Sequence, residues 1–450
     1  MNISVLEERK ASISRPTHKH EGRGIRCERE SVSGAVSQRA CVYCGARVVL
    51  NPITDAYHIV HGPIGCASYT WDIRGSLTSG AETYRNSFST DLRETDIVFG
   101  GEKKLAAAID ELFEKTNPAP KLVFVFATCI VGVIGDDIEA VCRAAEAKHG
   151  VRVIPVKAPG FSGTKSQGYR LACDAIMNLI RPQANQPKRF GVNFLGDYNL
   201  AGEAWIIRGY LEQIGIPVVS TITGDSSYET MLKAPSATLN IVQCAGSSEY
   251  LAKRMEAEMG IPYIRVSFFG IEDTTASLLR VADSFNRQDI SEKARQFAAK
   301  RTADVTPVIE KYKPHLEGKR AAIFVGGGFK AISLIRQFNE LGMETVVVGT
   351  QTGRKDEYEI IGSLVDSGTV ILDDANPAEL ERFMTEKQAD ILVGGVKERP
   401  LAYKLGMAFC DHNHERKHPL AGFEGIENFV MEIHKSINSP VWKYVREGAA

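Results

Sequence analysis

The sequence predicts an α/β protein with three Rossmann-like domains, each a mainly parallel sheet covered by helices. Two observations predict this class. Short, continuous runs of Val, Ile, Leu and Phe recur along the chain and alternate with longer segments of helical character. Continuous apolar strands are typical of parallel sheets that are buried on both faces. The chain also has 450 residues, a length typical of about three domains.

The expected strands and helices follow one another in a repeated strand–loop–helix order. The expected strands are residues 122–127, 151–156, 190–195, 217–221, 239–242, 263–268, 321–325, 345–348, 370–372 and 391–393. The expected helices include residues 103–114, 137–148, 200–214, 248–259 and 331–341. Alternation of this kind indicates βαβ units and therefore parallel sheets.

Two segments suggest domain boundaries. Residues 181–188 carry two prolines among polar residues before a new strand, and residues 289–320 form a long, charged, largely helical segment before another. They divide the chain into three α/β domains, at 39–188, 189–318 and 319–450. Residues 1–38 are polar and charged without apolar periodicity, which predicts a mobile N-terminal extension.

Composition and charge exclude several classes of protein. The chain is 44% hydrophobic and 24% charged, as in globular proteins with sizeable cores. Its 54 basic and 55 acidic residues leave a net charge of −1, which argues against binding to nucleic acid or to a membrane surface. No apolar run approaches the ~18 residues of a membrane span, and the N-terminus lacks the apolar core of a secretory signal. We therefore expect a cytoplasmic protein.

Nine cysteines need an explanation: Cys27, Cys41, Cys44, Cys66, Cys129, Cys142, Cys173, Cys244 and Cys410. Because their number is odd and the expected compartment is reducing, a disulfide framework is not expected. Each is then a small buried apolar residue or a metal ligand.

Two of these cysteines follow expected strands directly. Cys129 comes after the strand at 122–127, and Cys244 comes after the strand at 239–242. Ligands of doubly wound sheets bind at the carboxyl ends of strands, so both cysteines are candidate ligands. The alternative for each is a buried thiol.

A second group of cysteines lies near the N-terminus. Cys41 and Cys44 form a C-x-x-C pair, which suits a redox pair, half of a zinc site or an iron–sulfur ligand. A thioredoxin-like pair begins a helix after a strand, whereas this pair follows a polar segment, so we disfavour that interpretation. Cys66 ends a glycine-containing turn that allows close approach of a bulky ligand. His58 and His61 flank a strand-like stretch and are expected to be structural.

Two further motifs indicate a ligand site less specifically than the cysteines do. Gly326-Gly-Gly-Phe-Lys-Ala331 matches a dinucleotide fingerprint, but no acidic residue ends the next strand, which favours a tight strand-to-helix turn. Backbone amides and Lys330 there suit an anionic ligand. Residues 411–416, Asp-His-Asn-His-Glu-Arg, are dense in potential ligands, and a solvated polar loop is the alternative.

Taken together, the motifs resemble the nitrogenase component 1 superfamily over about residues 39–443. The resemblance rests on Cys41, His58-Ile-Val-His-Gly-Pro-Ile-Gly-Cys66, Ser89-Thr-Asp-Leu, Asp96-Ile-Val-Phe-Gly-Gly101, Thr128-Cys129, Ile134-Gly-Asp-Asp-Ile-Glu-Ala140, Gly196-Asp-Tyr-Asn199, Leu420-Ala-Gly-Phe-Glu-Gly425 and Ser439-Pro-Val-Trp442. Within the superfamily the chain is most similar to the alpha-type subunit of the scaffold that matures the iron–molybdenum cofactor.

The resemblance implies an iron–sulfur site at a subunit interface. Its three alpha-type ligands match Cys41, Cys66 and Cys129, and in the scaffold they share a [4Fe-4S] cluster with a beta-type partner subunit in an α2β2 heterotetramer. A cubane binds four thiolates, so a partner is needed to complete the set. Cys44 is extra to the family pattern.

The resemblance also implies a second site, for the cofactor precursor. The anchoring cysteine matches Cys244, and the polar or cationic pocket lining matches Lys330 and Lys165. The slot of the family's cofactor histidine falls on His412 or Asn413. The cargo that the resemblance implies is an 8Fe-type precursor cluster that transiently carries molybdenum and homocitrate. The resemblance also implies two further partners, the nitrogenase iron protein and a radical SAM protein that donates the precursor.

Two departures from the catalytic alpha subunit favour the scaffold. The helix that follows the Gly160-Phe-Ser-Gly163 loop lacks the catalytic subunit's histidine, and a Met-His-Ser-Trp setting is replaced by residues 411–416. The expected function is a non-catalytic assembly scaffold, and the alternative is the alpha subunit of a nitrogenase. A dark-operative protochlorophyllide reductase subunit would lack the anchoring cysteine, so Cys244 argues against it.

Overall fold

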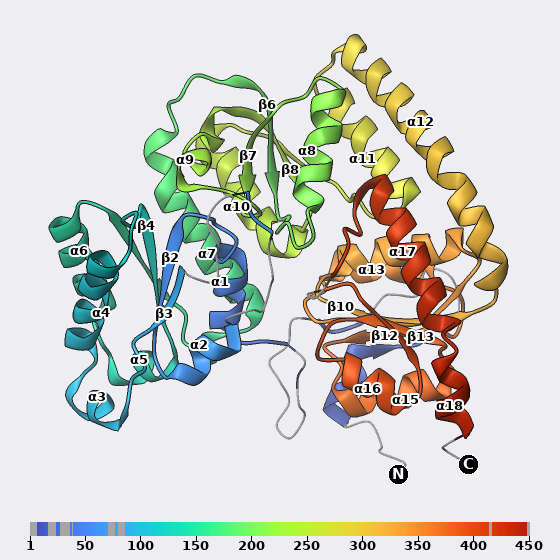
Figure 1. The fold of residues 1–450 in the computed structure, drawn as a ribbon, viewed down its shortest axis with the longest axis horizontal. Coiled ribbons are helices and arrows are strands. Elements are labelled where there is room, and N and C mark those ends of the chain that lie inside the picture. Colours follow the sequence, from blue (N-terminus) through green and yellow to red (C-terminus); the bar gives the residue numbers. More distant parts are fainter. Residues whose placement is uncertain are drawn as a thin grey trace. The chain divides into compact units, whose positions relative to one another are not determined.

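The computed structural model describes residues 7–16, 24–27, 37, 39–70, 77–79, 86–413 and 416–447. Within these, the chain forms two compact units (Figure 1). Unit 1 comprises residues 1–39, 201–216 and 266–450, and unit 2 comprises residues 40–200 and 217–265.

Unit 2 contains two parallel four-stranded sheets, in the orders β3-β2-β4-β5 and β7-β6-β8-β9. Its strands are β2 (Ala56–His61), β3 (Ser87–Ser89), β4 (Leu122–Ala127), β5 (Arg152–Lys157), β6 (Arg189–Leu195), β7 (Val218–Ile222), β8 (Ala237–Val242) and β9 (Tyr263–Arg265). Its helices are α1 (Val42–Leu50), α2 (Ile64–Thr70), α3 (Glu94–Phe99), α4 (Glu102–Lys115), α5 (Cys129–Ile134), α6 (Ile138–His149), α7 (Lys165–Ile180), α9 (Tyr228–Met231) and α10 (Ala245–Met259).

Strand β4 shows how the first sheet is buried on both faces. Leu122, Phe124 and Phe126 belong to a core that includes α1, α7 and α10. The alternating Val123 and Val125 belong to a second core with α4 and α6. Because side chains alternate across a strand, an all-apolar strand has to be covered by helices on both sides.

Helices α1 and α7 cross in backbone contact because each carries a glycine at the crossing. A Cβ atom added at Gly45 would overlap the carbonyl oxygen of Lys165, and one added at Gly168 would overlap that of Val42. An isolated β-bridge joins Cys41 to Thr164 just before the two helices begin. The crossing therefore fixes the N-terminal ends of both helices side by side.

Unit 1 contains one six-stranded sheet in the order β1-β12-β11-β10-β13-β14. Its strands are β1 (Ile13–Ser14), which is antiparallel, and the parallel β10 (Arg320–Val325), β11 (Glu344–Thr350), β12 (Val370–Asp373), β13 (Ile391–Gly394) and β14 (Ala408–Asp411). Its helices are α8 (Glu203–Gln213), α11 (Ile271–Asp283), α12 (Gln288–Tyr312), α13 (Gly328–Glu340), α14 (Lys355–Leu364), α15 (Pro377–Glu386), α16 (Arg399–Lys404), α17 (Gly422–Ile437) and α18 (Val441–Glu447).

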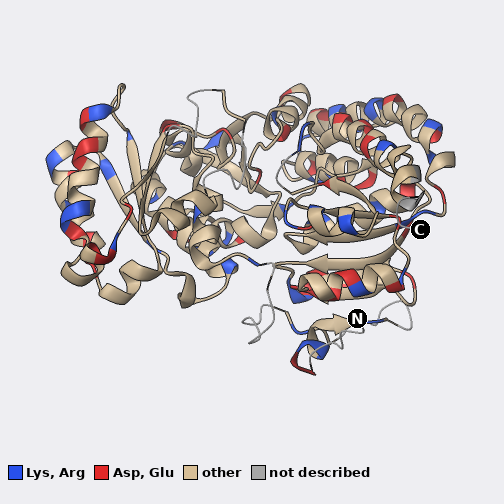
Figure 2. Ribbon diagram, turned by 60° about the horizontal axis from the view of Figure 1, so that its bottom comes forward, with Lys and Arg blue, Asp and Glu red and all other residues tan. Residues whose placement is uncertain are grey.

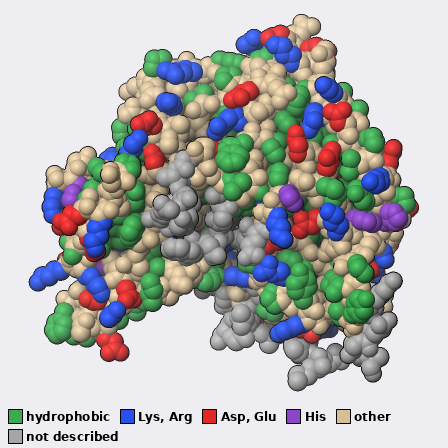
Figure 3. Space-filling view, in the orientation of Figure 1, with side chains coloured by type: hydrophobic (Ala, Val, Ile, Leu, Met, Phe, Trp, Pro, Cys, Tyr) green, Lys and Arg blue, Asp and Glu red, His purple; other side chains and the backbone are tan. Residues whose placement is uncertain are grey.

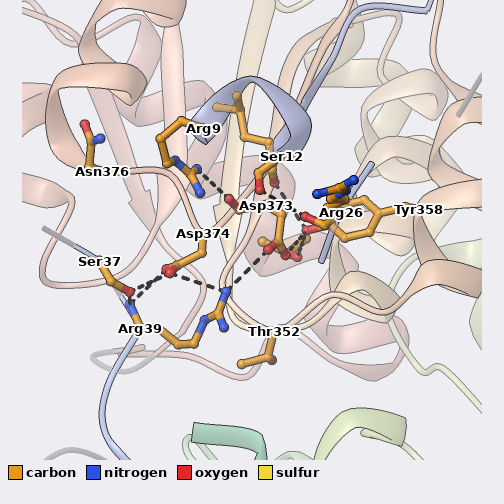
Figure 4. A network of polar contacts seen from close by, with 12 residues as sticks. Arg9, Ser12, Arg26, Ser37, Arg39, Thr352, Tyr358, Asp373, Asp374 and Asn376 are labelled. Atoms are coloured by element: carbon orange, nitrogen blue, oxygen red, sulfur yellow. Dashed lines mark hydrogen bonds and ion pairs between the residues drawn. The ribbon is translucent and has the colours of Figure 1, made fainter. Parts of the chain in front are cut away.

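The described part of the N-terminal segment packs on this sheet, which differs from the expected mobile extension. After a 3-10 helix at Glu7–Ser12, β1 pairs with β12. The guanidinium of Arg9 is buried against Glu379, and that of Arg39 lies 3.3 Å from carboxylate oxygens of both Asp373 and Asp374 (Figure 4). Buried ion pairs with good geometry anchor a segment that has no apolar periodicity.

The α/β class with mainly parallel sheets is confirmed, and all ten expected strands are present. Strands β1, β2, β3 and β14 had not been assigned as strands, because they are short or contain polar residues. The expected boundaries fall just before β6 and β10, each of which belongs to a new sheet. The two compact units group residues differently from the three expected domains, so those boundaries stay a prediction.

Basic and acidic residues are interspersed on the outer helices and on the visible surface (Figures 2 and 3), as the near-zero net charge suggests. Among the described helices, none combines the length and the apolar character that a membrane crossing requires.

Candidate functional site

Three cysteines lie at the starts of helices in unit 2. Cys41 is the N-cap residue of α1, Cys129 is the first residue of α5, and Cys66 lies in the first turn of α2. Strands β2 and β4 are parallel neighbours, and Cys66 and Cys129 follow them. The carboxyl ends of parallel strands meet at one edge of a sheet, so the fold brings these two residues to the same edge.

The loop at Gly160 brings Cys41 and Cys129 together. The amide of Gly160 donates a hydrogen bond to Cys129 Sγ at 3.1 Å. A Cβ atom added at Gly160 would lie 3.0 Å from Cys129 Sγ and 3.5 Å from Cys41 Sγ. The two sulfur atoms therefore flank one glycine, and any side chain at that position would crowd them.

The charges of the three thiols are coupled. Burial raises the pKa of Cys66, and negative charge at Cys129 and Cys41 raises it further. Assembling three thiolates therefore costs free energy unless a cation lies among them. Iron–sulfur clusters are held by cysteine thiolates, so the donor set fits such a group. Among the described residues, no group of three or more His, Cys, Asp or Glu side chains is arranged so that it could hold a single metal ion.

Cys44 is buried at the third position of α1, with its sulfur 3.7 Å from Cys41 Sγ. A hydrogen bond with Cys44 is the largest of the effects that lower the pKa of Cys41 from 9.0 to about 6. The pair thus lies at the start of a helix, whereas the sequence analysis placed it after a polar segment and did not predict a helix there. The preceding segment was interpreted as a polar tail, and that interpretation hid the helix start.

A polar network that sequence analysis missed connects the turns before Cys66 and after Cys129. His61 Nε2 donates to Asp136 at 3.1 Å, and its Nδ1 lies 3.0 Å from Thr90 Oγ1. The amide of Gly62 donates to Thr90 Oγ1, and that of Gly101 donates to Asp136. His61 is fully buried in this network, which agrees with a structural role, and that role stays a prediction. Four of the sequence motifs that carry the resemblance meet here.

Arg47 is a second residue that sequence analysis missed. It lies on the same helix as Cys41 and is buried, with its guanidinium carbon 5.4 Å from the ring centroid of Phe126. Its Nη2 donates to Ser87 Oγ, and its other two guanidinium nitrogens have no hydrogen-bond partner among the described residues. Burial lowers its pKa from 12.5 to about 10. An arginine inside the apolar run 42–50 was the available signal.

Cys244, in the same unit, is the half-buried N-cap residue of α10. Gly196, with φ +81°, follows β6, and a Cβ atom there would lie 3.0 Å from that of Cys244. Tyr198 donates to Ser247 Oγ at 2.5 Å and so supports the first turn of α10. The Gly196–Asn199 motif thus packs on the Cys244 turn, and the amides at the start of this helix favour an anion.

Lys165, also in unit 2, is the first residue of α7. The residue is buried, and its Nζ lies 6.0 Å from the ring centroid of Tyr169. The predicted helix start at Gly163-Thr-Lys165 is therefore correct.

Lys330 and His412 lie together in unit 1. Lys330 Nζ donates to the carbonyl oxygen of His412 at 3.0 Å and lies 5.6 Å from the ring centroid of Phe269. The His412 ring is fully buried between Phe269 and Phe429, and neither of its nitrogens has a hydrogen-bond partner among the described residues. Burial, and then the charges of Lys330 and Arg416, hold the pKa of His412 well below 6.5. The imidazole is neutral, the form in which histidine binds metals. His414 and Glu415 of the same motif lie outside the described residues.

The glycine-rich turn after β10 holds an internal carboxylate. Glu357 accepts a hydrogen bond from the amide of Phe329 at 3.0 Å, and a Cβ atom added at Gly328 would lie 2.6 Å from that of Glu357. Glu357 therefore occupies the place beside the start of α13 where a dinucleotide phosphate would bind. This contact supports the tight-turn interpretation over the dinucleotide one.

Comparison with known proteins gives the family. The model of the family "Nitrogenase component 1 type Oxidoreductase" matches residues 41–438. The chain belongs to the nitrogenase component 1 family. Relatives within it include proteins called nitrogenase iron-molybdenum cofactor biosynthesis protein NifE. The one from Clostridium pasteurianum is 64% identical, over 99% of this chain and 98% of that protein, and the one from Methanosarcina barkeri is 51% identical over the same shares.

Solved structures of the nitrogenase component 1 family agree with the fold. The structure titled "Nitrogenase Cp1 at pH 6.5" matches with a TM-score of 0.90 and 30% identity, covering 97% of this chain and 96% of that one. The nitrogenase component 1 resemblance and the α/β class are therefore both confirmed.

Proposed function

We propose that this chain is the alpha-type subunit of a scaffold on which the iron–molybdenum cofactor of nitrogenase is assembled, and that it does not itself reduce dinitrogen. The observation that carries the proposal is full-length similarity to proteins named for the biosynthesis of that cofactor, at 64% identity for the one from Clostridium pasteurianum. The two separate cysteine sites support it, since a scaffold needs a permanent cluster and a place for cargo.

Cys41, Cys66 and Cys129 would hold a [4Fe-4S] cluster that is shared with a partner subunit. Three cysteines leave one thiolate of a cubane to be supplied from outside this chain. When bound, the cluster supplies a metal link between subunits and an electron-transfer group.

The surface beside these cysteines suits a partner protein. Ile64, Val133 and Phe161 are exposed by 58%, 73% and 64%, and they lie on or next to the elements that carry Cys66, Cys129 and the Gly160 loop. Large apolar side chains around a site indicate a protein interface. A NifN-like beta-type subunit, in an α2β2 heterotetramer, is the partner that we propose.

Cys244 would bind a terminal iron of an 8Fe-type precursor cluster, which is cargo rather than a resident cofactor. The start of α10 and Lys165 favour an anionic cluster. In unit 1, Lys330 and the neutral imidazole of His412 would take part in holding the cargo as molybdenum and homocitrate are added. A precursor-donating radical SAM protein and the nitrogenase iron protein are the further partners that we propose, in the cytoplasm.

The interface site is tested by single alanine variants of Cys41, Cys66 and Cys129 in the complex co-expressed with its beta-type subunit. We expect each to lose the cluster's EPR signal and iron, because no other ligand replaces a thiolate equally well. Cys142→Ala is the matched control, since its thiol is buried away from the site. An unchanged iron content in the three variants would exclude the site.

The cargo site is tested by Cys244→Ala with Cys173→Ala as its control. Cys173 is buried, and its Sγ lies 3.3 Å from the carbonyl oxygen of Ser247, so its loss perturbs the same helix without removing the ligand. We expect Cys244→Ala to lose the precursor's iron and keep the cubane, whereas Cys173→Ala costs about 1 kcal/mol of stability and keeps both.

The alpha subunit of a nitrogenase is the second candidate, favoured by the TM-score of 0.90 to Nitrogenase Cp1. An assay of acetylene and dinitrogen reduction, with iron protein and a reductant, separates the two functions. The scaffold binds iron without turnover, and sustained turnover would establish the alternative.

A further inference from the structure

Cys44 has no role in the sites described above, and its position relative to Cys41 suggests one. The two sulfur atoms are 3.7 Å apart, with Cys41 at the N-cap and Cys44 in the first turn of α1. Residues i and i+3 of a helix have Cα atoms about 5 Å apart, which lies within the range that a disulfide bridges. To form the bond, the sulfur atoms would have to close from 3.7 Å to the about 2.05 Å of a disulfide.

The two cysteines differ in access, as the partners of an oxidisable dithiol do. Cys41 is partly exposed and lies beside the Gly160 loop, whereas Cys44 is only 1% exposed. A solvent oxidant reaches Cys41 first, and Cys44 is then placed to react with it from inside. This is the arrangement of an attacking and a resolving cysteine.

We propose that Cys41 and Cys44 form a reversible dithiol–disulfide pair when no cluster occupies the interface site. A peroxide oxidises the Cys41 thiolate to a sulfenic acid and releases hydroxide. The Cys44 thiol then attacks that sulfur, forms the S–S bond and releases water. The two thiols lose two electrons and the peroxide gains them.

The consequence rests on the proposed function of Cys41 as a cluster ligand. A disulfide withholds that ligand and blocks loading, but it also protects the sulfur from irreversible oxidation to sulfinic and sulfonic acids. A dithiol reductant restores Cys41 by thiol–disulfide exchange. Cluster loading at this interface is thereby made dependent on a reducing environment.

Peptide mapping tests the pair directly, because trypsin releases Cys41 and Cys44 together in the peptide Ala40–Arg47, which holds no other cysteine. The full-length chain, stripped of iron, is treated with hydrogen peroxide and then alkylated. We expect this peptide to lose two hydrogen atoms and resist alkylation, and dithiothreitol to reverse both changes. Cluster-loaded protein should be protected.

Cys44→Ala and Cys142→Ala provide the comparison. After peroxide, dithiothreitol should restore most iron uptake in the parent and in Cys142→Ala, but not in Cys44→Ala, where Cys41 is oxidised to its acids. Pairing of Cys41 with Cys66 or Cys129, or its acids in the parent, would overturn the proposal. If the peptide oxidises as expected but the untreated chain binds no cluster even in complex with its beta-type subunit, the proposed function fails and the dithiol stands.

Discussion

His61 Nε2 and the Asp136 carboxylate lie 3.1 Å apart, and this contact ties the turn before Cys66 to the turn after Cys129. His61 ends β2, and Asp136 follows α5, so the pair connects segments 75 residues apart in sequence. The buried carboxylate also accepts the amide of Gly101. The contact therefore holds the backbone on which two proposed cluster ligands depend.

We predict that Asp136→Ala lowers both stability and cluster content. It leaves the buried His61 ring and the Gly101 amide without an acceptor, at a cost of about 1–3 kcal/mol. Asp137→Ala is the matched control, because it removes the N-cap of α6 at about 1 kcal/mol without touching His61. Urea unfolding and iron analysis of both variants check the prediction, and equal iron content in the two would contradict it.

Gly45→Ala should displace Cys41 by spreading α1 and α7 apart. The added Cβ atom overlaps the Lys165 carbonyl oxygen in a backbone crossing, so we expect a loss of at least about 2 kcal/mol together with loss of cluster iron. A Cβ atom added at Gly209, on α8, meets no other atom within 4 Å. Gly209→Ala should therefore raise the free energy of unfolding by up to about 1 kcal/mol. A Gly45→Ala protein as stable as the parent would show that the helices separate freely.

The strands that end at candidate ligands could be predicted from sequence, because long apolar strands carry their own signal. Cys129 and Cys244 each follow such a strand, and both lie at helix starts as a doubly wound sheet requires. Local signals also located the start of α7 at Lys165. The residues alone did not decide whether each thiol binds a ligand or is simply buried. Only the family resemblance implied a ligand role for them.

Contacts between distant segments could not be predicted. The His61–Asp136 pair depends on how β2 and β4 align in the sheet, and no local pattern encodes that alignment. The N-terminal segment was expected to be mobile because it lacks apolar periodicity. Its described part is anchored by the ion pairs of Arg9 and Arg39, and two such side chains leave no periodic pattern in the sequence. The same interpretation concealed the helix start at Cys41.

Asp373 should make stability depend on pH. Burial raises its pKa from 3.8 to about 7, despite the opposing charge of Arg39, so the folded chain keeps a proton that the unfolded chain releases. Its contribution is full below about pH 4 and is lost as pH rises towards 7, by at most about 1.4 kcal/mol per pH unit. Asp373→Asn removes the part of the slope that Asp373 contributes, while Glu398, whose pKa burial also raises to about 7, keeps its own part. Denaturation midpoints of both proteins between pH 4 and 7 check it, and parallel curves would contradict it.

The last prediction concerns the two buried histidines that lack hydrogen-bond partners among the described residues, His412 and His58. Both rings are packed against phenylalanines, His412 against Phe269 and Phe429 and His58 against Phe124 and Phe126. An unsatisfied buried nitrogen costs stability, so a histidine in such a place needs another reason to be there. The role proposed above for His412, as a ligand to a metal of the cargo, would supply that reason.

His412→Leu should therefore separate stability from function. Leucine fills a similar volume without the orphaned nitrogens, so the cluster-free chain should unfold within about 1 kcal/mol of the parent or be more stable. Retention of the precursor should nevertheless fall severalfold, because a ligand is gone. His58→Leu should have the same effect on stability and none on retention. Urea unfolding of the cluster-free chains and iron retained after gel filtration of the loaded complexes give the two readouts. Undiminished retention in His412→Leu would remove the histidine from the cargo site, and equal loss in both variants would assign the effect to packing.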